Sequence, residues 1–303
     1  MPSEIINHWL FLSLLCAFTL AASDAIAKKY LSHLDFKALT LVRLALAGTL
    51  MLPLALRVEI SHLPPAFWLW MAISVPAEIT AMYLYMKAIR DYPLSFTVPY
   101  LAFTPIFAVL IAWLILQESI SVSGLAGILL IIVGAWFLNL SETEGLSVKT
   151  ALKPFHYILI NPGSRYMLIA AVIYSFTAVS TKAAMQYMPA SQFGAFYYLS
   201  VGMVALLLFG RGGYSKIRQN FKAALLVALL MAVMVYLHFL ALEKIEVAYM
   251  ISVKRTSLLF GIIFGVLFFR EIHLGMLVFA GCLMLAGVGV FGWVWGCVCV
   301  VLV

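Results

Sequence analysis

Long uninterrupted runs of apolar residues dominate this sequence of 303 residues. A helix that crosses a bilayer needs about 20 mostly apolar residues, because the hydrocarbon core is about 30 Å thick and the helix rises about 1.5 Å per residue. Barrel strands would be half as long and would alternate, so the runs predict an all-α integral membrane protein with ten transmembrane helices. The ten runs lie at roughly 8–28, 37–56, 66–88, 93–116, 121–140, 165–186, 192–210, 221–242, 246–269 and 273–296.

The charge content agrees with a lipid environment. Only 10% of the residues are Asp, Glu, Lys or Arg, whereas a soluble domain averages about 25%. No Lys or Arg precedes Lys28, so we interpret the first run as a span and not as a cleavable signal peptide. The four cysteines have no histidine or acidic residue beside them in a metal-binding pattern. The sequence therefore predicts no metal site and no cofactor.

Basic residues are unequally divided between alternate loops. If the N-terminus lies outside the cytoplasm, the inner loops contain thirteen Lys and Arg residues, and the outer loops contain only Arg57 and Lys244. Cytoplasmic loops carry such an excess, so we predict that both termini lie outside the cytoplasm of a bacterial or archaeal cell. The net charge of +7 then reflects orientation in the membrane, and nucleic acid is not an expected partner.

The two halves of the chain form a repeat. With an offset of 153 residues they align without a gap over about 55 residues, so that "YLYMKAI" at 83–89 meets "YLHFLAL" at 236–242. Five spans per half is an odd number, so the second half must enter the membrane upside down. The sequence therefore predicts two inverted five-helix repeats, 1–140 and 165–303, joined by a cytoplasmic connector at 141–164.

Glu118 and Glu271 occupy equivalent positions at the ends of the fourth spans of the two halves. Each is either a boundary charge beside a tight turn or a latch between helices that changes with the transport state. Pro99 and Pro105 lie in the first of these spans. Prolines kink helices, and a kink there can serve as a gate.

Small residues repeat in the same two spans. Ala108 and Ala112 align with Gly261 and Gly265. Small residues four apart let membrane helices approach closely, so we predict a packing seam. The seam lies either within one protomer or between the protomers of a homodimer.

With these features the chain resembles the drug/metabolite transporter superfamily, specifically transporters with tandem EamA-type domains. The resemblance covers nearly the whole chain. It rests on "LILQES" and "VLFFRE", each followed by a glycine-rich span ("GLAGILLIIVGAW" and "GCLMLAGVGVFGW"), and on "LTLVRLALAG" with Arg43. The second half departs from the pattern at Leu258, which replaces a proline, and at "SVKRTSLLFG", which contains two cations. The resemblance implies a ten-helix carrier of small metabolites, often an exporter.

Glu78 lies about 12 residues into the third span, roughly 18 Å deep. A charge in a span costs at least about 2.5–3.5 kcal/mol on insertion scales, so it indicates function by default. A carboxylate at this depth can exchange a proton or bind a substrate amine. The alternative is a structural pair with a cation on another helix.

Lys254 and Arg255 lie within the ninth span, because only 14 residues separate Arg255 from Arg270. Adjacent helix positions point about 100° apart, so we expect only one of the two to face a cavity. Arg binds carboxylate or phosphate with two hydrogen bonds, and Lys acts as a point charge. The pair is either an anion site or a salt bridge to Glu78.

Three other charges have simpler alternatives. Arg43 either contacts substrate or pairs with an acid. Asp24 stands four residues before Lys28, which is the spacing of a helical ion pair. Lys182 is expected to reach the membrane surface by snorkelling.

Tyr83 and Tyr236 are equivalent by the repeat, as are Tyr85 and His238. Such polar aromatics could line a transport path, or they could simply pack against neighbouring helices. We predict the first role for the pair Tyr83 and Tyr236.

These features together favour a secondary transporter that works by alternating access. The sequence contains no Walker motif, so the protein is not expected to hydrolyse nucleotide. The expected substrate is a small zwitterionic or anionic metabolite such as an amino acid, exported with or without protons. The alternatives are a flippase or exporter of a lipid-linked or amphiphilic drug, a membrane-embedded enzyme, and a scaffold. Scattered histidines and the lack of a paired carboxylate motif argue against the enzyme.

Overall fold

The computed structural model describes residues 2–92, 97–140, 160–210, 214–269 and 279–291. Within these ranges every regular element is a helix and no strand occurs. Six helices are long and apolar enough to cross a membrane, and three shorter apolar helices accompany them. The all-α membrane class is thus confirmed, while the count of ten spans stays a prediction. Helices dominate because a lipid-facing backbone must satisfy its own hydrogen bonds.

The first half begins with a long helix and continues through a broken one. Asp35 caps the second predicted span, where its side chain accepts a hydrogen bond from the Ala38 amide at 3.1 Å. The elements are α1 (Pro2–Tyr30), α2 (Phe36–Leu41), the π-helical η1 (Val42–Leu46), α3 (Ala47–Leu50), α4 (Leu52–Ala55), α5 (Pro65–Asp91), the 3₁₀-helical η2 (Val98–Phe103), α7 (Thr104–Leu116) and α8 (Val122–Leu140).

The second half has corresponding elements. The ninth predicted span is divided at Arg255 and Thr256 into two helices, as the fourth is divided where η2 meets α7. The elements are α10 (Pro162–Met185), α11 (Ala190–Phe209), α12 (Tyr214–Gln219), α13 (Phe221–Leu242), α14 (Val247–Lys254), α15 (Ser257–Phe269) and a C-terminal helix, Phe279–Phe291.

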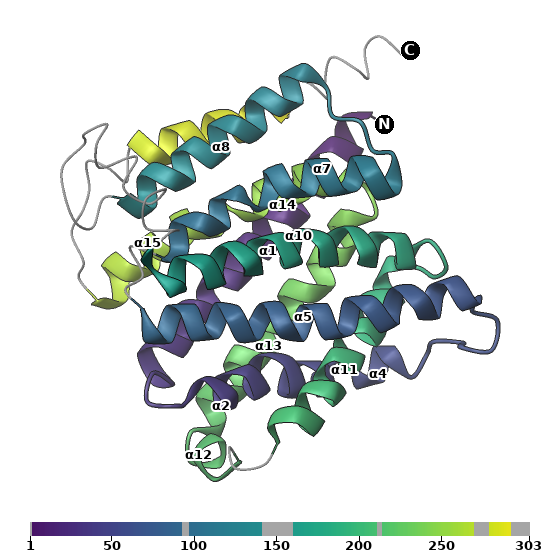
Figure 1. The fold of residues 1–303 in the computed structure, drawn as a ribbon, viewed down its shortest axis with the longest axis vertical. Helices are drawn as coiled ribbons and strands as arrows, with labels where there is room; N and C mark the ends of the chain where they lie inside the picture. The colour runs from purple at the N-terminus through teal and green to yellow at the C-terminus, as the bar shows by residue number, and fades with distance from the viewer. Residues whose placement is uncertain (1, 93–96, 141–159, 211–213, 270–278, 292–303) are drawn as a thin grey trace.

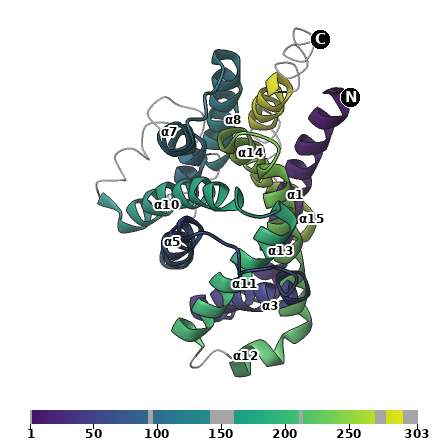
Figure 2. The same cartoon turned by 90° about the vertical axis from the view of Figure 1, so that its right-hand side faces the viewer.

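The longest helix contacts in the bundle join one half of the chain to the other. The helix α1 lies along α13, and its counterpart α10 lies along α5 (Figures 1 and 2). The first helix of each half therefore packs on the third helix of the other half. This reciprocal packing places the interior of the protein between the halves.

Counterpart helices also meet directly, at glycines. A Cβ added to Gly48 would lie 2.7 Å from the carbonyl oxygen of Tyr198, and one added to Gly202 would lie 2.6 Å from the carbonyl oxygen of Leu44. The offset within each equivalent pair is 154 residues, because 198 − 44 and 202 − 48 are equal. As the numbers rise along one helix they fall along the other, so the counterparts run antiparallel.

The same arrangement recurs between α8 and the C-terminal helix, which lie side by side in Figure 1. A Cβ on Gly134 would lie 2.8 Å from the carbonyl oxygen of Ala280, and one on Gly287 would lie 2.6 Å from that of Gly127. Here the offset is 153. Antiparallel counterparts with reciprocal contacts are the geometry that an inverted repeat requires.

The four small residues of the predicted packing seam differ in their surroundings, and the seam itself stays a prediction. Ala108 and Ala112 are fully buried, whereas a Cβ added to Gly261 would meet no atom within 4 Å among the described residues. The close approach expected at Gly261 therefore does not occur, although Gly265 is buried.

Candidate functional site

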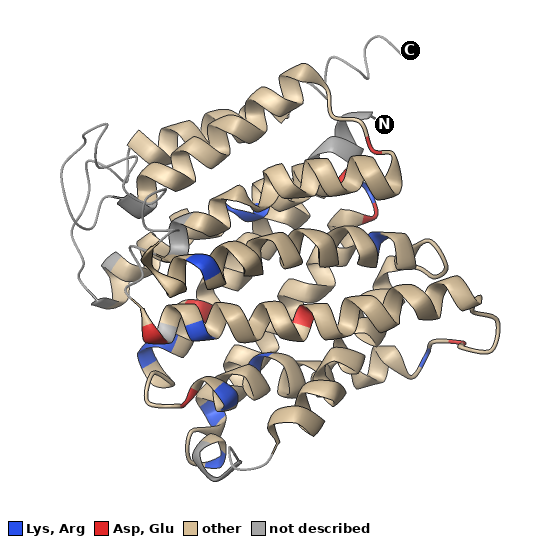
Figure 3. Ribbon diagram, viewed as in Figure 1, with Lys and Arg blue, Asp and Glu red and all other residues tan. Residues whose placement is uncertain are grey.

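A cavity of about 200 Å³ lies between the two halves. Helices α1, α5, α10, α13 and α14 all contribute to its wall. Most charged residues of the described chain lie toward the ends of the helices (Figure 3), so charge along a cavity in the interior is an exception. The charged side chains of the lining are Asp24, Arg43, Glu78, Lys254 and Arg255.

Glu78 projects from the middle of α5 toward α10. Its Oε2 accepts a hydrogen bond of 2.7 Å from the Thr177 hydroxyl, which also donates to the Tyr174 carbonyl within α10. No cation among the described residues lies within ion-pair distance of Glu78, and Lys254 interacts with it only at longer range. The structural ion pair considered for Glu78 is therefore not formed. The sequence gives no signal for this contact, except that Thr177 places a hydroxyl group in an apolar span.

Lys254 and Arg255 lie where the ninth span is divided. The guanidinium Nε of Arg255 donates a hydrogen bond of 2.7 Å to the hydroxyl of Thr104, the residue at which α7 begins. The breaks in the fourth and ninth spans are thus connected directly. Broken helices of this kind are typical of binding sites in transporters built from inverted repeats.

Both cations line the cavity, which corrects the expectation that only one would face it. The expectation assumed a continuous helix. Instead, α14 ends at Lys254, and Arg255 and Thr256 form a turn before α15. Within the described chain, neither cation is in ion-pair contact with a carboxylate.

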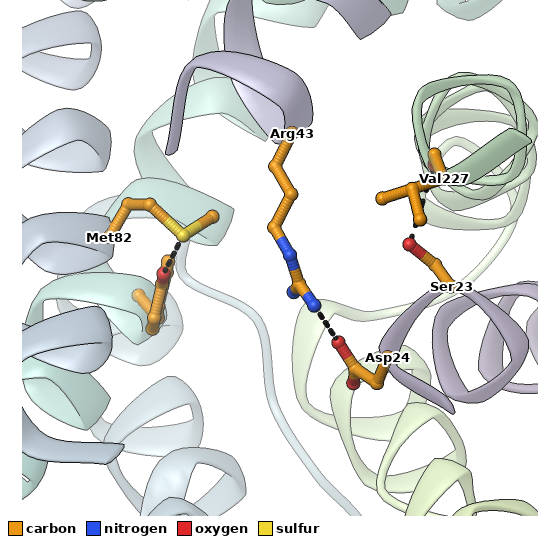
Figure 4. A network of polar contacts seen from close by, with 6 residues as sticks. Ser23, Asp24, Arg43, Met82 and Val227 are labelled. Carbon is orange, nitrogen blue, oxygen red and sulfur yellow. Dashed lines mark hydrogen bonds and ion pairs between the residues drawn. The ribbon is translucent and has the colours of Figure 1, made fainter. Parts of the chain in front are cut away.

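Asp24 and Arg43 form a closed ion pair at another wall of the cavity. Arg43 donates from Nη2 to Asp24 Oδ1 at 2.5 Å (Figure 4). The helical pair of Asp24 with Lys28 was therefore the wrong prediction for the partner of Asp24. Arg43 belongs to the π-helical turn η1 and is only 6% exposed, so its guanidinium requires an acceptor from the protein.

Further polar contacts fix the helices around this pair. The Tyr198 hydroxyl of α11 donates to the Arg43 carbonyl at 3.0 Å. The Ser23 hydroxyl donates to the Val227 carbonyl of α13 at 3.4 Å, and Met82 accepts a hydrogen bond on its sulfur (Figure 4). The contacts connect the helices of both halves around the cavity.

The two repeat-related aromatic pairs have different positions. Tyr83 packs against Phe36 and stacks on Phe209, and neither Tyr83 nor Tyr236 lines the described cavity. Their contact with substrate stays a prediction. Tyr85 and His238 do line the cavity. The His238 Nδ1 is buried and has no hydrogen-bond partner in the described structure.

Glu118 connects three elements at one end of the bundle, which the predicted topology places outside the cytoplasm. Its Oε1 pairs with Lys182 Nζ of α10 at 2.7 Å, and its Oε2 accepts from the Val247 amide that begins α14 at 2.9 Å. Lys182 also donates to the Ile245 carbonyl at 2.6 Å. Lys182 is thus held by an ion pair and does not snorkel. We call Glu118, Lys182, Ile245 and Val247 the outer latch.

The remaining predicted gate residues are less informative. Gln117 takes a left-handed conformation with φ of 57°, which ends α7 just before Glu118. Pro105 is buried in the first turn of α7, and Pro99 belongs to η2. Glu271 lies outside the described residues.

No group of three His, Cys, Asp or Glu side chains in the described ranges could hold a metal ion.

Comparisons with known proteins place the chain in a family. The model of the EamA-like transporter family matches residues 7–140 and 161–293, one segment in each half. The chain belongs to the EamA-like transporter family. It is therefore an integral membrane transporter of the drug/metabolite transporter superfamily, and its family is one of transporters and not of enzymes.

A solved structure titled "Crystal structure of protein" has the same fold as this EamA-like transporter. The two superpose with a TM-score of 0.73 and 16% identity, over 94% of this chain and 95% of the other. The comparison with curated protein sequences gave no match. At this level of identity the likeness concerns the fold alone.

Proposed function

We propose that this EamA-like transporter is a secondary carrier that exports a small zwitterionic or anionic metabolite, such as an amino acid, by alternating access. The observation that carries the proposal is the cavity between the halves, in which Glu78, Lys254 and Arg255 have no ion-pair partner among the described residues. Unpaired charges inside a membrane protein are costly, so they are kept where a substrate or an ion completes them.

The size of the cavity favours a small substrate. Its volume is about 200 Å³, whereas pockets for drug-sized ligands measure roughly 300–1,000 Å³. A metabolite the size of an amino acid matches this space better than a lipid-linked or amphiphilic drug does. Three methionines line the wall and offer an adaptable apolar surface: Met82, Met231 and Met234.

The unpaired charges of the cavity and the outer latch have separate roles in the proposed cycle. Lys254 and Arg255 bind the acidic group of the substrate, with the positive end of the α15 dipole beside them. Glu78 binds an ammonium group or carries a proton across. The outer latch keeps α7, α10 and α14 together at the outer end, and it must open before substrate can leave on that side.

Counterflow in proteoliposomes tests this function. Vesicles containing the protein are loaded with an amino-acid mixture, and labelled exchange is followed with and without a pH gradient. We expect exchange that responds to the gradient in the parent protein. The Glu78→Gln variant should still exchange but ignore the gradient. Glu59→Gln, a change at an exposed loop carboxylate, is the matched control and should behave like the parent.

Two results would contradict parts of the proposal. If Glu78→Gln responds to the gradient as the parent does, Glu78 is not the proton site. If folded protein exchanges no amino acid, the amino-acid assignment is wrong.

A further inference from the structure

The charged groups of the cavity do not balance. Its lining contains two carboxylates, Asp24 and Glu78, and three cations, Arg43, Lys254 and Arg255. Asp24 and Arg43 neutralise each other at 2.5 Å. One carboxylate then faces two cations, so the cavity has a surplus of one positive charge when Glu78 is ionised and of two when Glu78 is protonated.

Lys254 and Arg255, the two cations without an ion-pair partner among the described residues, can still donate hydrogen bonds to a ligand. Arg255 uses Nε on Thr104, and its terminal nitrogens have no ion-pair partner in the described chain. Lys254 makes no hydrogen bond with a described residue, while Glu78, Cys16 and His238 lie near enough for longer-range electrostatic interaction. A buried cation without a partner is unfavourable, and a bound anion removes that cost.

A zwitterion adds no net charge and would leave the surplus in place. A monoanion cancels it when Glu78 is ionised, and a dianion cancels it when Glu78 carries a proton. We propose that the substrate of this transporter carries a net negative charge, with a carboxylate or phosphate group held by Lys254 and Arg255. This inference rests on the proposed function and narrows its substrate class. It also links coupling to charge, since a dianion travels with one proton and a monoanion with none.

The rest of the lining limits the body of such an anion. Four tyrosines and one histidine supply polar groups, and the volume of about 200 Å³ leaves room for only a compact carbon skeleton. The lining residues with these groups are Tyr85, Tyr174, Tyr197, Tyr198 and His238. The predicted class is therefore a small hydroxylated or amino-substituted carboxylate or phosphate ester.

Matched pairs of compounds test the inference by binding. The purified full-length protein is heated with glutamate or glutamine, with lactate or propane-1,2-diol, and with glycerol 3-phosphate or glycerol. We expect the anionic member of at least one pair to raise the unfolding temperature with saturation, and its partner to have little effect. Lys254→Gln and Arg255→Gln should lose that rise. Lys244→Gln, at an exposed outer-loop lysine, should keep it.

Counterflow of the same pairs separates this inference from the proposed function. We expect the anionic member to exchange at least about tenfold faster in the parent protein. Exchange of the uncharged or zwitterionic members alone would overturn the inference and leave the protein a transporter. Saturable stabilisation by anions without exchange of any compound would support the anion site and contradict the proposed export of such metabolites. If no anion stabilises the parent more than the two Gln variants, the inference is wrong.

Discussion

Glu118 and Glu78 are both carboxylates between helices, yet their surroundings are opposite. Glu118 has a lysine at 2.7 Å and a backbone amide at 2.9 Å. Glu78 has one threonine hydroxyl and faces a cavity that contains two unpaired cations. Among the described residues, the first carboxylate has an ion-pair partner and the second has none.

The same contrast holds for the cations. Arg43 and Lys182 are paired with carboxylates, and Lys254 and Arg255 are not in ion-pair contact within the described chain. Paired charges should therefore matter for stability, because removing one partner leaves the other buried alone. Removing an unpaired charge should impair transport without destabilising the fold, because a buried charge without a partner is itself unfavourable. The predictions below test this division.

Arg255→Gln should have the largest effect, on transport. Losing a unit charge about 4 Å from an anion costs up to roughly 4 kcal/mol at the effective dielectric constant of a protein. We expect counterflow at low substrate concentration to fall by at least about 30-fold, without a decrease of the unfolding temperature. Arg255→Lys should retain part of the rate, because it keeps the charge but loses the planar fork. If the variant unfolds at a lower temperature but its counterflow rate is unchanged, Arg255 stabilises the fold and does not act in transport.

Asp24→Asn should act on stability instead. Breaking a buried ion pair costs about 3–5 kcal/mol, and because the Asp24 side chain is 41% exposed we expect about 2–3 kcal/mol. Denaturant unfolding in detergent measures it. Adding Arg43→Gln should recover most of the loss, since no guanidinium then remains without an acceptor. A single variant as stable as the parent would show that the cavity supplies Arg43 with another partner.

Lys182→Gln should loosen the outer latch. The two side chains of the ion pair are 19% and 13% exposed, so they are partly screened, and we expect a loss of about 1–2 kcal/mol. A cysteine at position 181, introduced as Thr181→Cys, reports opening because Thr181 lines the cavity. A membrane-impermeant maleimide should label it faster from outside in the Lys182→Gln background. Equal labelling rates, with Lys244→Gln as control, would remove the latch from the mechanism.

Glu246 should have the smallest effect, and it depends on pH. The residue precedes the span Val247–Gly265, and burial, together with the nearby Glu118 carboxylate, raises its pKa although Lys182 opposes this. Glu243 and Lys244 share its loop. A raised pKa in the folded state means that protonation favours folding, so stability should increase as pH falls from neutrality toward the ordinary Glu value of about 4.3.

The Glu246→Gln variant tests this pH dependence. At pH 7 the variant should be more stable to unfolding than the parent. The difference in stability should disappear at lower pH, where Glu246 of the parent is protonated. Because the residue is partly exposed, we expect less than about 1 kcal/mol. A parent and variant with parallel stability profiles between pH 5 and 7 would contradict the prediction.

The all-α membrane class and the unusual charges of three apolar runs could be predicted from the sequence, because both depend on local composition. Glu78, Lys254 and Arg255 stand out in apolar runs whatever the packing. Partners could not be predicted in the same way. The acceptor of Arg43 is Asp24 on another helix, and periodicity along one helix contains no information about contacts between helices.

The turn after α14 could not be predicted from the sequence. No proline or glycine lies between Lys254 and Ser257, so the turn that brings both cations to the cavity has no local signal. Identity between the halves singles out Tyr83 and Tyr236, whereas Tyr85 and His238 are the repeat-related pair that lines the cavity. Positions two apart on a helix point about 200° from each other, and only the packed structure shows which direction faces the cavity.

The glycine contacts between the second span and α11 also have a mechanical consequence. Gly48 and Gly202 bring two backbones together at equivalent points of both halves, so the contact lies close to the axis that relates them. It can serve as a fulcrum about which the halves tilt. With helix ends about 15 Å away, a tilt of about 10° would move them by roughly 2–3 Å. A bulky residue at either glycine would separate the two backbones. We expect this to change the tilt between the halves, and thereby to move the ends of all the helices together.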